Sequence, residues 1–177
     1  YNSDGKLVLS NDQDSRQVMS QKAVDYMNYC LDNVVKEGTG TPADIAGQHV
    51  AGKTGSTTSN KDRWFCGYTD YYTAAVWCGY DVPEVISLVG NLRNPACRLF
   101  QKVMAPLHEG LPAVPLYDES KMIQVGICLD SGKLATDSCA NDVRGDCRTQ
   151  TVLVYEEDLP TELCDKHIAV DFCVTGN

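Results

Sequence analysis

The sequence predicts an α+β fold, in which helices pack on an antiparallel meander of strands and a small, loop-rich β appendage follows. Three observations support this class. Apolar residues recur at helical spacing in two segments, three runs of strand-forming residues are joined by short polar connections, and the composition changes after a Pro-rich linker. A chain of 177 residues has room for one domain and an appendage.

The amino-acid composition and net charge indicate which classes of binding partner are disfavoured. Apolar residues make up 43% of the chain and charged residues 22%, which is typical of globular proteins. The net charge of −9 and the lack of any Lys/Arg cluster argue against a nucleic-acid partner. No stretch of about 18 apolar residues occurs, so we expect no membrane span within this sequence.

The first element expected is a hairpin turn at Asp4-Gly5, with Lys6–Leu9 as its outgoing strand. The incoming strand is nearly absent, so we expect the sequence to be a piece of a longer protein. A helix should then cover residues 20–37, with Ser20 as its N-cap and Gly38 as a left-handed C-cap. Its expected buried face comprises Ala23, Val24, Met27, Leu31, Val34 and Val35.

Three strands are expected next, at His49–Thr57, Arg63–Tyr68 and Tyr72–Tyr80, because β-branched and aromatic residues are frequent there. The connections at 58–62 and 69–71 are short and polar, which predicts sequential antiparallel pairing.

A second helix should start at Asn94-Pro95, where Asn94 can cap the helix and Pro95 suits its first turn. It should lie across the meander. Its expected apolar stripe comprises Ala96, Leu99, Phe100, Val103, Met104 and Leu107.

The amino-acid composition changes after the second helix, and this change predicts three regions: residues 1–110 as the main domain, 111–121 as a linker and 122–177 as the appendage. In the appendage, strands are expected at 122–129 and 149–155.

The segment GQHVAGKTGSTT, residues 47–58, fits two different motifs. It matches G-x-x-x-x-G-K-[ST], the phosphate-binding loop, and it contains K-T-G at Lys53-Thr54-Gly55. A phosphate-binding loop needs a strand before the first Gly and a helix after the Lys-Thr. The flanks EGTGTPADIA and GSTTSNKD predict neither, so a nucleotide-binding function is disfavoured.

The nine cysteines form two groups. Those in apolar segments are expected to be small buried residues: Cys30, Cys66, Cys78, Cys97 and Cys128. Those in the polar C-terminal part are Cys139, Cys147, Cys164 and Cys173. For this second group a disulfide is favoured over free thiols, and zinc is the third alternative because Cys164-Asp-Lys-His167 is a Cys-x-x-His pair. We expect no cofactor and no metal site, and ordinary structural roles for His49, His108 and His167.

Residues 50–81, VAGKTGSTTSNKDRWFCGYTDYYTAAVWCGYD, resemble the K-T-G region of the class A, bifunctional penicillin-binding proteins. That family has A-G-K-T-G-T-T, K-D-x-W-F-x-G-Y-T and V-W-x-G-Y-D in the same order and spacing. The segments SRQVMS, EGTGTPA, ICLDSGKLATDSCAN and PTELCDKH are also similar to the family. The resemblance implies part of a serine transpeptidase/β-lactamase-like fold.

The resemblance also implies a function, namely D,D-transpeptidation, which cross-links peptidoglycan by serine acyl transfer at D-Ala-D-Ala ends and is inhibited by β-lactams. Lys53 and Ser56 would be catalytic, the latter through its backbone N–H as an oxyanion donor. The expected substrate-binding set is Lys53, Thr54, Gly55, Ser56 and Thr57. The family often has Thr at the position of Ser56, and Ser keeps the hydroxyl.

We expect the S-x-x-K nucleophile and the S-x-N motif to be missing from these residues, so that the chain alone is inactive. The expected partners are the stem peptide, β-lactam antibiotics, the N-terminal half of the domain, and a second copy of the chain at an open sheet edge. The expected location is the extracytoplasmic face of the bacterial membrane, with an anchor and a glycosyltransferase domain outside this sequence. A rival hypothesis is a non-catalytic module that binds peptide carboxylates.

Overall fold

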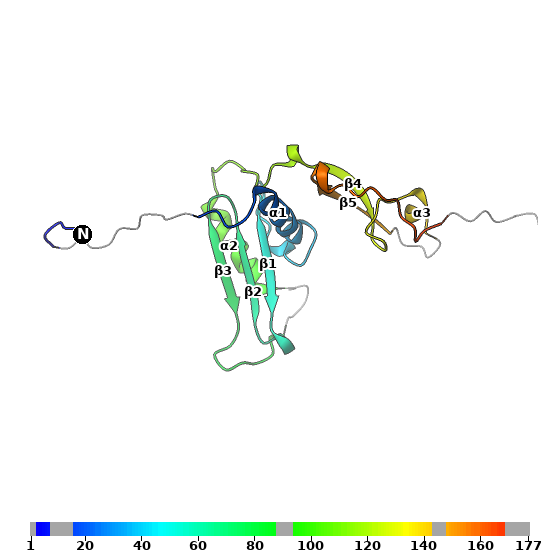
Figure 1. Cartoon of the computed structure of the whole chain (residues 1–177). Helices are drawn as coiled ribbons and strands as arrows, with labels where there is room; N and C mark the ends of the chain where they lie inside the picture. Colours follow the sequence, from blue (N-terminus) through cyan, green and yellow to red (C-terminus); the bar gives the residue numbers. More distant parts are fainter. Residues whose placement is uncertain (1–2, 8–15, 88–93, 143–147, 169–177) are drawn as a thin grey trace, which may run out of the picture.

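A computed structural model describes residues 3–7, 16–87, 94–142 and 148–168 (Figure 1). Its helices are α1 (Gln21–Lys36), α2 (Pro95–Leu107) and the short α3 (Asp137–Ala140). Its strands are β1 (Ala51–Ser56), β2 (Arg63–Tyr68), β3 (Thr73–Cys78), β4 (Ile123–Cys128) and β5 (Thr149–Val154). The fold is therefore mixed α+β, as expected. In the described ranges, no helix is long and apolar enough to cross a membrane.

The first three strands form one antiparallel sheet in the order β1-β2-β3, which confirms the predicted meander. In the register, Lys53 faces Cys66 on β2, and Cys66 faces Ala75 on β3. The strand β1 is at one edge of this sheet and β3 is at the other.

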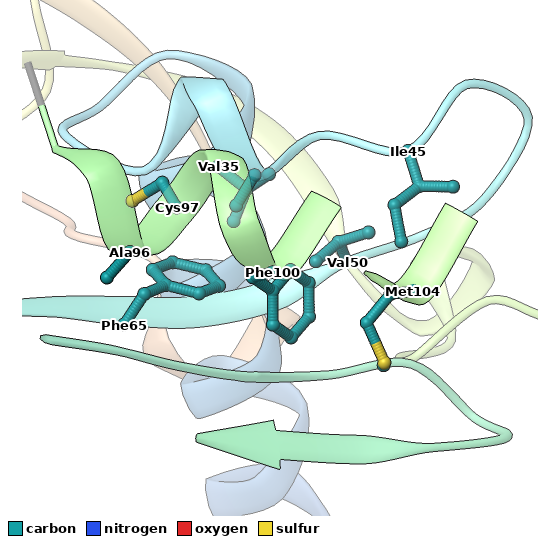
Figure 2. Close-up of a cluster of buried hydrophobic side chains, with 9 residues drawn as sticks. Val35, Ile45, Val50, Phe65, Ala96, Cys97, Phe100 and Met104 are labelled. Atoms are coloured by element: carbon teal, nitrogen blue, oxygen red, sulfur yellow. The ribbon is translucent and has the colours of Figure 1, made fainter. Parts of the chain in front are cut away.

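The core lies between α2 and the face of the sheet that carries Phe65, and the C-terminal end of α1 reaches this core beside β1 (Figure 2). At its centre the rings of Phe65 and Phe100 meet edge to face with centroids 4.8 Å apart, and both side chains are fully buried. A Cβ at Gly52 or at Gly67 would lie 2.4 or 2.5 Å from the Phe65 ring. Both glycines are therefore needed to make room for Phe65.

The predicted helix starts are confirmed, because Ser20 accepts a hydrogen bond from the Ala23 amide and Asn94 from the Ala96 amide. The prediction for Gly38 is wrong, since it is not among the glycines with positive φ. A Cβ at Gly38 would instead lie 2.9 Å from the Val34 backbone, so the glycine permits a close turn.

The predicted apolar faces of both helices are only partly buried. On α1, Val35 is buried, but Met27 is 51% exposed and Ala23 is also exposed. On α2, the core takes Ala96, Cys97, Phe100 and Met104, whereas Leu99, Val103 and Leu107 are about half exposed.

The first described residues agree only in part with the expected hairpin. A turn covers Ser3–Gly5, with φ +74° at Gly5, but Lys6 and Leu7 are not in a strand. Val8 and Leu9 lie outside the described residues.

In the appendage, β4 and β5 pair as an antiparallel hairpin, close to the strands expected there. The hairpin is held against α1 by hydrogen bonds. Tyr26 donates to Asp158 at 2.8 Å and accepts from the Tyr155 amide at 2.8 Å, and Tyr29 accepts from the Leu153 amide at 3.3 Å.

Candidate functional site

The K-T-G residues lie on β1 at an edge of the sheet. In an antiparallel ladder, residues alternate between those that hydrogen-bond to the partner strand and those whose N–H and C=O point away from it. The Thr57 amide donates to the Asp62 carbonyl at 3.3 Å, which makes this a bonded pair. It follows that the backbone N–H and C=O groups of Thr54 and Ser56, at the non-bonded positions, point to the outer edge of β1.

The Lys53 side chain lies along the same edge. Its Nζ donates to the Thr54 carbonyl oxygen at 3.1 Å and is 3.5 Å from the Thr54 hydroxyl, and the side chain is exposed. This contact agrees with the outward direction of the Thr54 carbonyl. A positive charge and outward-facing amides therefore share one edge, which is an arrangement suited to an anion.

The two hydroxyls of the motif have protein partners. The Thr54 Oγ1 is 2.8 Å from the Thr39 Oγ1, and the Ser56 Oγ accepts from the Arg63 guanidinium at 2.7 Å. Arg63 is directly opposite Ser56 in the strand register. One cation, Arg63, therefore contacts Ser56, and a second cation, Lys53, contacts Thr54 on the same strand.

The far end of β1 is fixed by Asp62. Its carboxylate accepts from the Trp77 indole N–H at 2.9 Å and from the Thr57 hydroxyl at 2.9 Å. These hydrogen bonds, Trp77 first and Thr57 second, lower the pKa of Asp62 below its ordinary value. Asp62 thus holds Thr57 and the turn after β1 in place.

All five sequence-predicted site residues, 53–57, lie together on or directly after β1. Gly55 is opposite Trp64, and a Cβ at Gly55 would lie 3.2 Å from the Trp64 Cβ. The residues line an open strand edge. The described cavities, of about 670 Å³ beside His49 and Tyr117 and about 510 Å³ beside Ile45, are lined by other residues.

One expectation about missing motifs is wrong. Ser3 has a lysine, Lys6, three residues later and so matches the S-x-x-K spacing. Ser3 and Lys6 are exposed and belong to a turn and the coil after it. A serine and a lysine three residues apart share a face in a helix, and this segment is not helical. The S-x-N spacing does not occur in the sequence.

The phosphate-binding loop is excluded by the fold. The strand β1 continues through Lys53 and Thr54 to Ser56, where that loop requires the start of a helix.

Sequence reasoning missed two residues at this site, Thr39 and Arg63. Thr39 belongs to the EGTGTPA segment, to which no role was assigned. Arg63 could have been found from the register, because a tight turn after Thr57 places it opposite Ser56.

The structure corrects the predictions for several cysteines. Cys139 and Cys164 are free rather than in disulfides, and Cys147 and Cys173 lie outside the described residues. Of the cysteines expected to be buried, Cys97 and Cys128 are buried, Cys78 is partly buried, and Cys30 and Cys66 are exposed. The side chain of His167, expected to play no special role, is 5% exposed and lies beside Cys128 and Cys164.

Comparisons with known proteins identify the family of the chain. Residues 5–85 match the family model "Penicillin binding protein transpeptidase domain", and residues 119–169 match "Penicillin-binding protein 1A, C-terminal domain". A solved structure, penicillin-binding protein 1A from Haemophilus influenzae, is similar with a TM-score of 0.53 at 17% identity. The similarity covers 82% of this chain and 22% of that one, and supports the fold.

Proteins similar to this chain occur in Clostridium and Bacillus species. Penicillin-binding protein 1A of Clostridium perfringens (strain ATCC 13124) is 33% identical over 167 residues, which cover 93% of this chain and 20% of the relative. The Clostridium novyi protein of the same name is 34% identical over 171 residues, covering 93% and 19%. Penicillin-binding protein 1F of Bacillus subtilis is 34% identical over 112 residues, covering 60% and 16%.

This chain therefore spans about a fifth of the length of the clostridial relatives. Both family models match it in the same order as the meander and the appendage. The chain belongs to the penicillin-binding proteins, with part of a transpeptidase domain followed by a C-terminal domain of the penicillin-binding protein 1A type.

Proposed function

We propose that β1 forms one wall of a peptidoglycan D,D-transpeptidase site, at which a stem peptide ending in D-Ala-D-Ala is cross-linked by serine acyl transfer. The observation that supports this most directly is the shared edge of β1, along which the Ser56 amide and the Lys53 ammonium are both presented. Acyl transfer at a peptide end with a free carboxylate makes use of both groups. The ammonium attracts the substrate carboxylate, and the amide stabilises the oxyanion.

Each residue of the motif has a role in this proposal. Lys53 and the hydroxyls of Thr54 and Ser56 bind the terminal carboxylate of the peptide or of a β-lactam. Gly55 leaves space for the substrate backbone, and Thr57 keeps the end of the strand in position through Asp62. The Ser56 N–H is one of two oxyanion donors, and the loss of one such donor typically slows acyl transfer about 100- to 1,000-fold.

Carboxylate binding can be tested on this chain by NMR. An N-acyl-D-Ala-D-Ala peptide should shift the amide resonances of residues 53–57 saturably, and the same peptide with a C-terminal amide should not. The variant Lys53→Met removes the charge but keeps the length, and should abolish most of the response. Equal shifts with both peptides, or an unchanged response in Lys53→Met, would contradict the proposal.

The nucleophile is proposed to come from a part of the transpeptidase domain outside these 177 residues, because Ser3 and Lys6 lie in a non-helical segment. The chain alone should therefore form no acyl-enzyme. Fluorescent penicillin should leave no covalent band on a denaturing gel. A band would contradict this, and the Ser3→Ala variant would then identify or exclude Ser3 as the nucleophile.

A substitution at Lys53 distinguishes the proposed catalytic site from a non-catalytic module that only binds carboxylates. Within the longer protein, Lys53→Met should abolish penicillin acylation if β1 belongs to a catalytic site. If β1 is only a binding module, acylation should persist while peptide binding is lost.

The proposed location is the extracytoplasmic face of the membrane, where peptidoglycan is built, with the anchor outside this sequence.

We also propose that residues 111–121 separate the transpeptidase part from the appendage, and the two family matches, 5–85 and 119–169, support this division.

The outer edge of β3 is proposed to pair with the remaining part of the transpeptidase domain. In its absence, that edge should pair with a second copy of the chain.

A further inference from the structure

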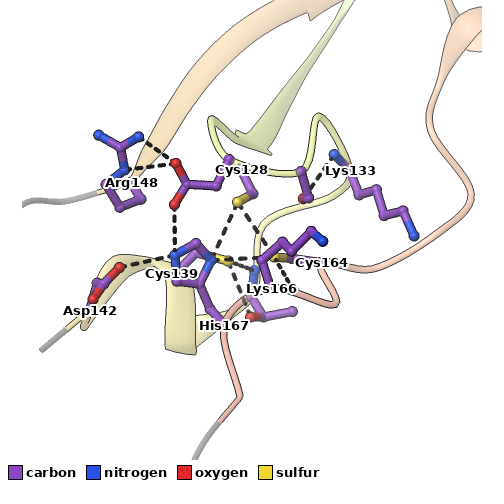
Figure 3. A network of polar contacts seen from close by, with 11 residues as sticks. Cys128, Lys133, Cys139, Asp142, Arg148, Cys164, Lys166 and His167 are labelled. Carbon is purple, nitrogen blue, oxygen red and sulfur yellow. Dashed lines mark hydrogen bonds and ion pairs between the residues drawn. The ribbon is translucent and has the colours of Figure 1, made fainter. Parts of the chain in front are cut away.

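Three cysteines and a histidine converge at the end of the β4–β5 hairpin (Figure 3). Cys128 ends β4, Cys139 lies in α3, and Cys164 and His167 come from the loop after β5. One ligand atom from each residue lies within 4.8 Å of all the others. The three cysteines are buried, and together with Ala135 they form the core cluster of this region.

The spacing between the atoms fits coordination of a metal ion. The sulfurs of Cys128 and Cys164 are 3.4 Å apart, and the His167 Nδ1 is 3.4 and 3.3 Å from them. Tetrahedral zinc with Zn–S bonds near 2.3 Å and Zn–N bonds near 2.1 Å would separate its ligands by about 3.6–3.8 Å. A disulfide would require about 2.05 Å between two sulfurs, and it would leave the third thiol and the imidazole without a role.

The histidine is oriented for this task by two carboxylates. Its Nε2 is 3.1 Å from the Asp130 carboxylate and 3.0 Å from the Asp142 carboxylate. A proton on Nε2 satisfies both carboxylates and leaves the lone pair on Nδ1, which is the nitrogen that faces the sulfurs. Metal-bound histidines are commonly held by a carboxylate in this way.

Backbone amides support the sulfurs as well. The Lys166 N–H donates to the Cys164 sulfur at 3.3 Å, and the Thr136 N–H to the Cys139 sulfur at 3.4 Å. Hydrogen bonds from amides stabilise thiolates, and the thiolate is the form of cysteine that binds metal.

We propose that Cys128, Cys139, Cys164 and His167 form a closed, tetrahedral site for a structural Zn²⁺ ion. Four protein ligands leave no position for a substrate, so the role is structural rather than catalytic. Three thiolates and one imidazole in tetrahedral geometry suit zinc, whereas Mg²⁺ and Ca²⁺ require oxygen ligands. The ion would join the β4–β5 hairpin, α3 and the final loop, a region with few other core side chains.

The first test is the metal content of the whole chain, purified under reducing conditions with zinc present. One zinc per chain is expected. X-ray absorption should show three sulfurs at about 2.3 Å and one nitrogen at about 2.0–2.1 Å. Replacement with Co²⁺ should give the intense visible absorption of a tetrahedral thiolate site. A metal-free protein, or a Cys128–Cys164 disulfide found by mass spectrometry, would overturn the proposal.

Variants provide the second test. Cys128→Ser, Cys139→Ser, Cys164→Ser and His167→Gln should each lose the zinc, while the same change at the exposed Cys30 or Cys66 should not. Asp142→Asn should weaken zinc binding by about 10-fold or more, because Asp142 only positions His167. His167→Cys should retain zinc with four sulfurs, which keeps the test valid if the other variants fail to fold. Retention of zinc in the three serine variants would overturn the proposal.

Discussion

Ser56 presents its two polar groups in different directions. Its hydroxyl accepts a hydrogen bond from Arg63, while its amide points to the outer edge of β1. The Lys53 ammonium is also at that edge. A carboxylate that binds both the Ser56 hydroxyl and the Lys53 ammonium would therefore also lie near Arg63, a cation outside the sequence motif.

The first prediction concerns Arg63. The variant Arg63→Met should weaken the binding of N-acyl-D-Ala-D-Ala peptide about two- to fivefold, since an exposed charge pair is worth at most about 1 kcal/mol. The loss should shrink at high salt, because surface charges are screened. NMR titration at two salt concentrations measures both effects.

The matched control for Arg63→Met is Arg98→Met, which removes an exposed arginine from α2. That variant should leave the affinity unchanged. Tighter peptide binding by Arg63→Met would contradict the prediction, and it would mean that Arg63 competes with the substrate for the Ser56 hydroxyl.

At the residue scale, the sequence was sufficient to place Lys53, Thr54 and Ser56 together on one strand, but it did not identify the residues that contact them. The motif residues are contiguous in a strand, so their spacing alone brings them to one edge. Thr39 reaches Thr54 through the fold of the loop after α1, and Arg63 depends on the strand register. Contacts of this kind depend on tertiary structure, and a local motif does not contain them.

At the scale of elements, α1 is the contact point between the transpeptidase part and the appendage. Asp25 is 1% exposed and accepts hydrogen bonds from the Tyr155 hydroxyl and, at 2.9 Å, from the Gln21 amide. Asp32, also 1% exposed, accepts from Tyr117 at 3.2 Å. A buried carboxylate that loses such a donor is destabilising, so these tyrosines should be important for keeping the appendage in place.

The second prediction concerns Tyr155 and pH. The hydrogen bond to Asp25, followed by burial, raises the pKa of Tyr155 from an ordinary value near 10 to about 12. A raised folded-state pKa gives stability that is complete below pH 10 and is lost as the pH rises towards 12. Tyr155→Phe should therefore lower the melting temperature at pH 8 and remove part of the decline between pH 10 and 12.

Thermal unfolding of both proteins from pH 8 to pH 12 tests this prediction. Tyr80→Phe is a suitable control, because Tyr80 is 53% exposed and follows β3 rather than lying in the appendage. Its pH profile should follow that of the unaltered chain. Parallel profiles for Tyr155→Phe and the unaltered chain would disprove the role of the Asp25 contact.

The starts of the two long helices were predicted correctly, because local interactions determine where a helix begins. Ser20 and Asn94 cap the helices that they were expected to start, because capping needs only a side chain and the first turn. Burial was predicted less well, since helical periodicity identifies an apolar face without showing what covers it. Met27 and Val103 follow the predicted stripes and are half exposed.

The cysteine cluster shows more clearly that a sequence pattern does not reveal which side chains come together in the fold. Cys128 lies in an apolar strand, which predicts a core position, while for Cys139 and Cys164 a disulfide is favoured over free thiols and zinc. The sequence contained one useful signal, the Cys164–His167 pair. The other two ligands are distant in sequence and come together only through the hairpin and the backbone bridge between Leu134 and Leu163.

At the scale of the whole molecule, the free edge of β3 is the feature with the largest consequence for assembly. Among the described residues β3 pairs only with β2. The Thr69 amide donates to the Tyr72 carbonyl, so by alternation the N–H groups of Thr73, Ala75 and Trp77 point outward. An open edge with outward amides can pair with another strand.

The last prediction tests this edge with a single substitution. Ala75→Pro removes an outward N–H without removing a hydrogen bond to β2, and proline is tolerated in edge strands. The unaltered chain should dimerise as its concentration rises, and Ala75→Pro should shift that equilibrium to monomer. Ala75→Ser, which keeps the amide, should dimerise normally. Sedimentation velocity over a range of concentrations distinguishes these cases. A monomeric unaltered chain at high concentration, or an Ala75→Pro dimer of the same strength, would show that β3 is not the contact surface.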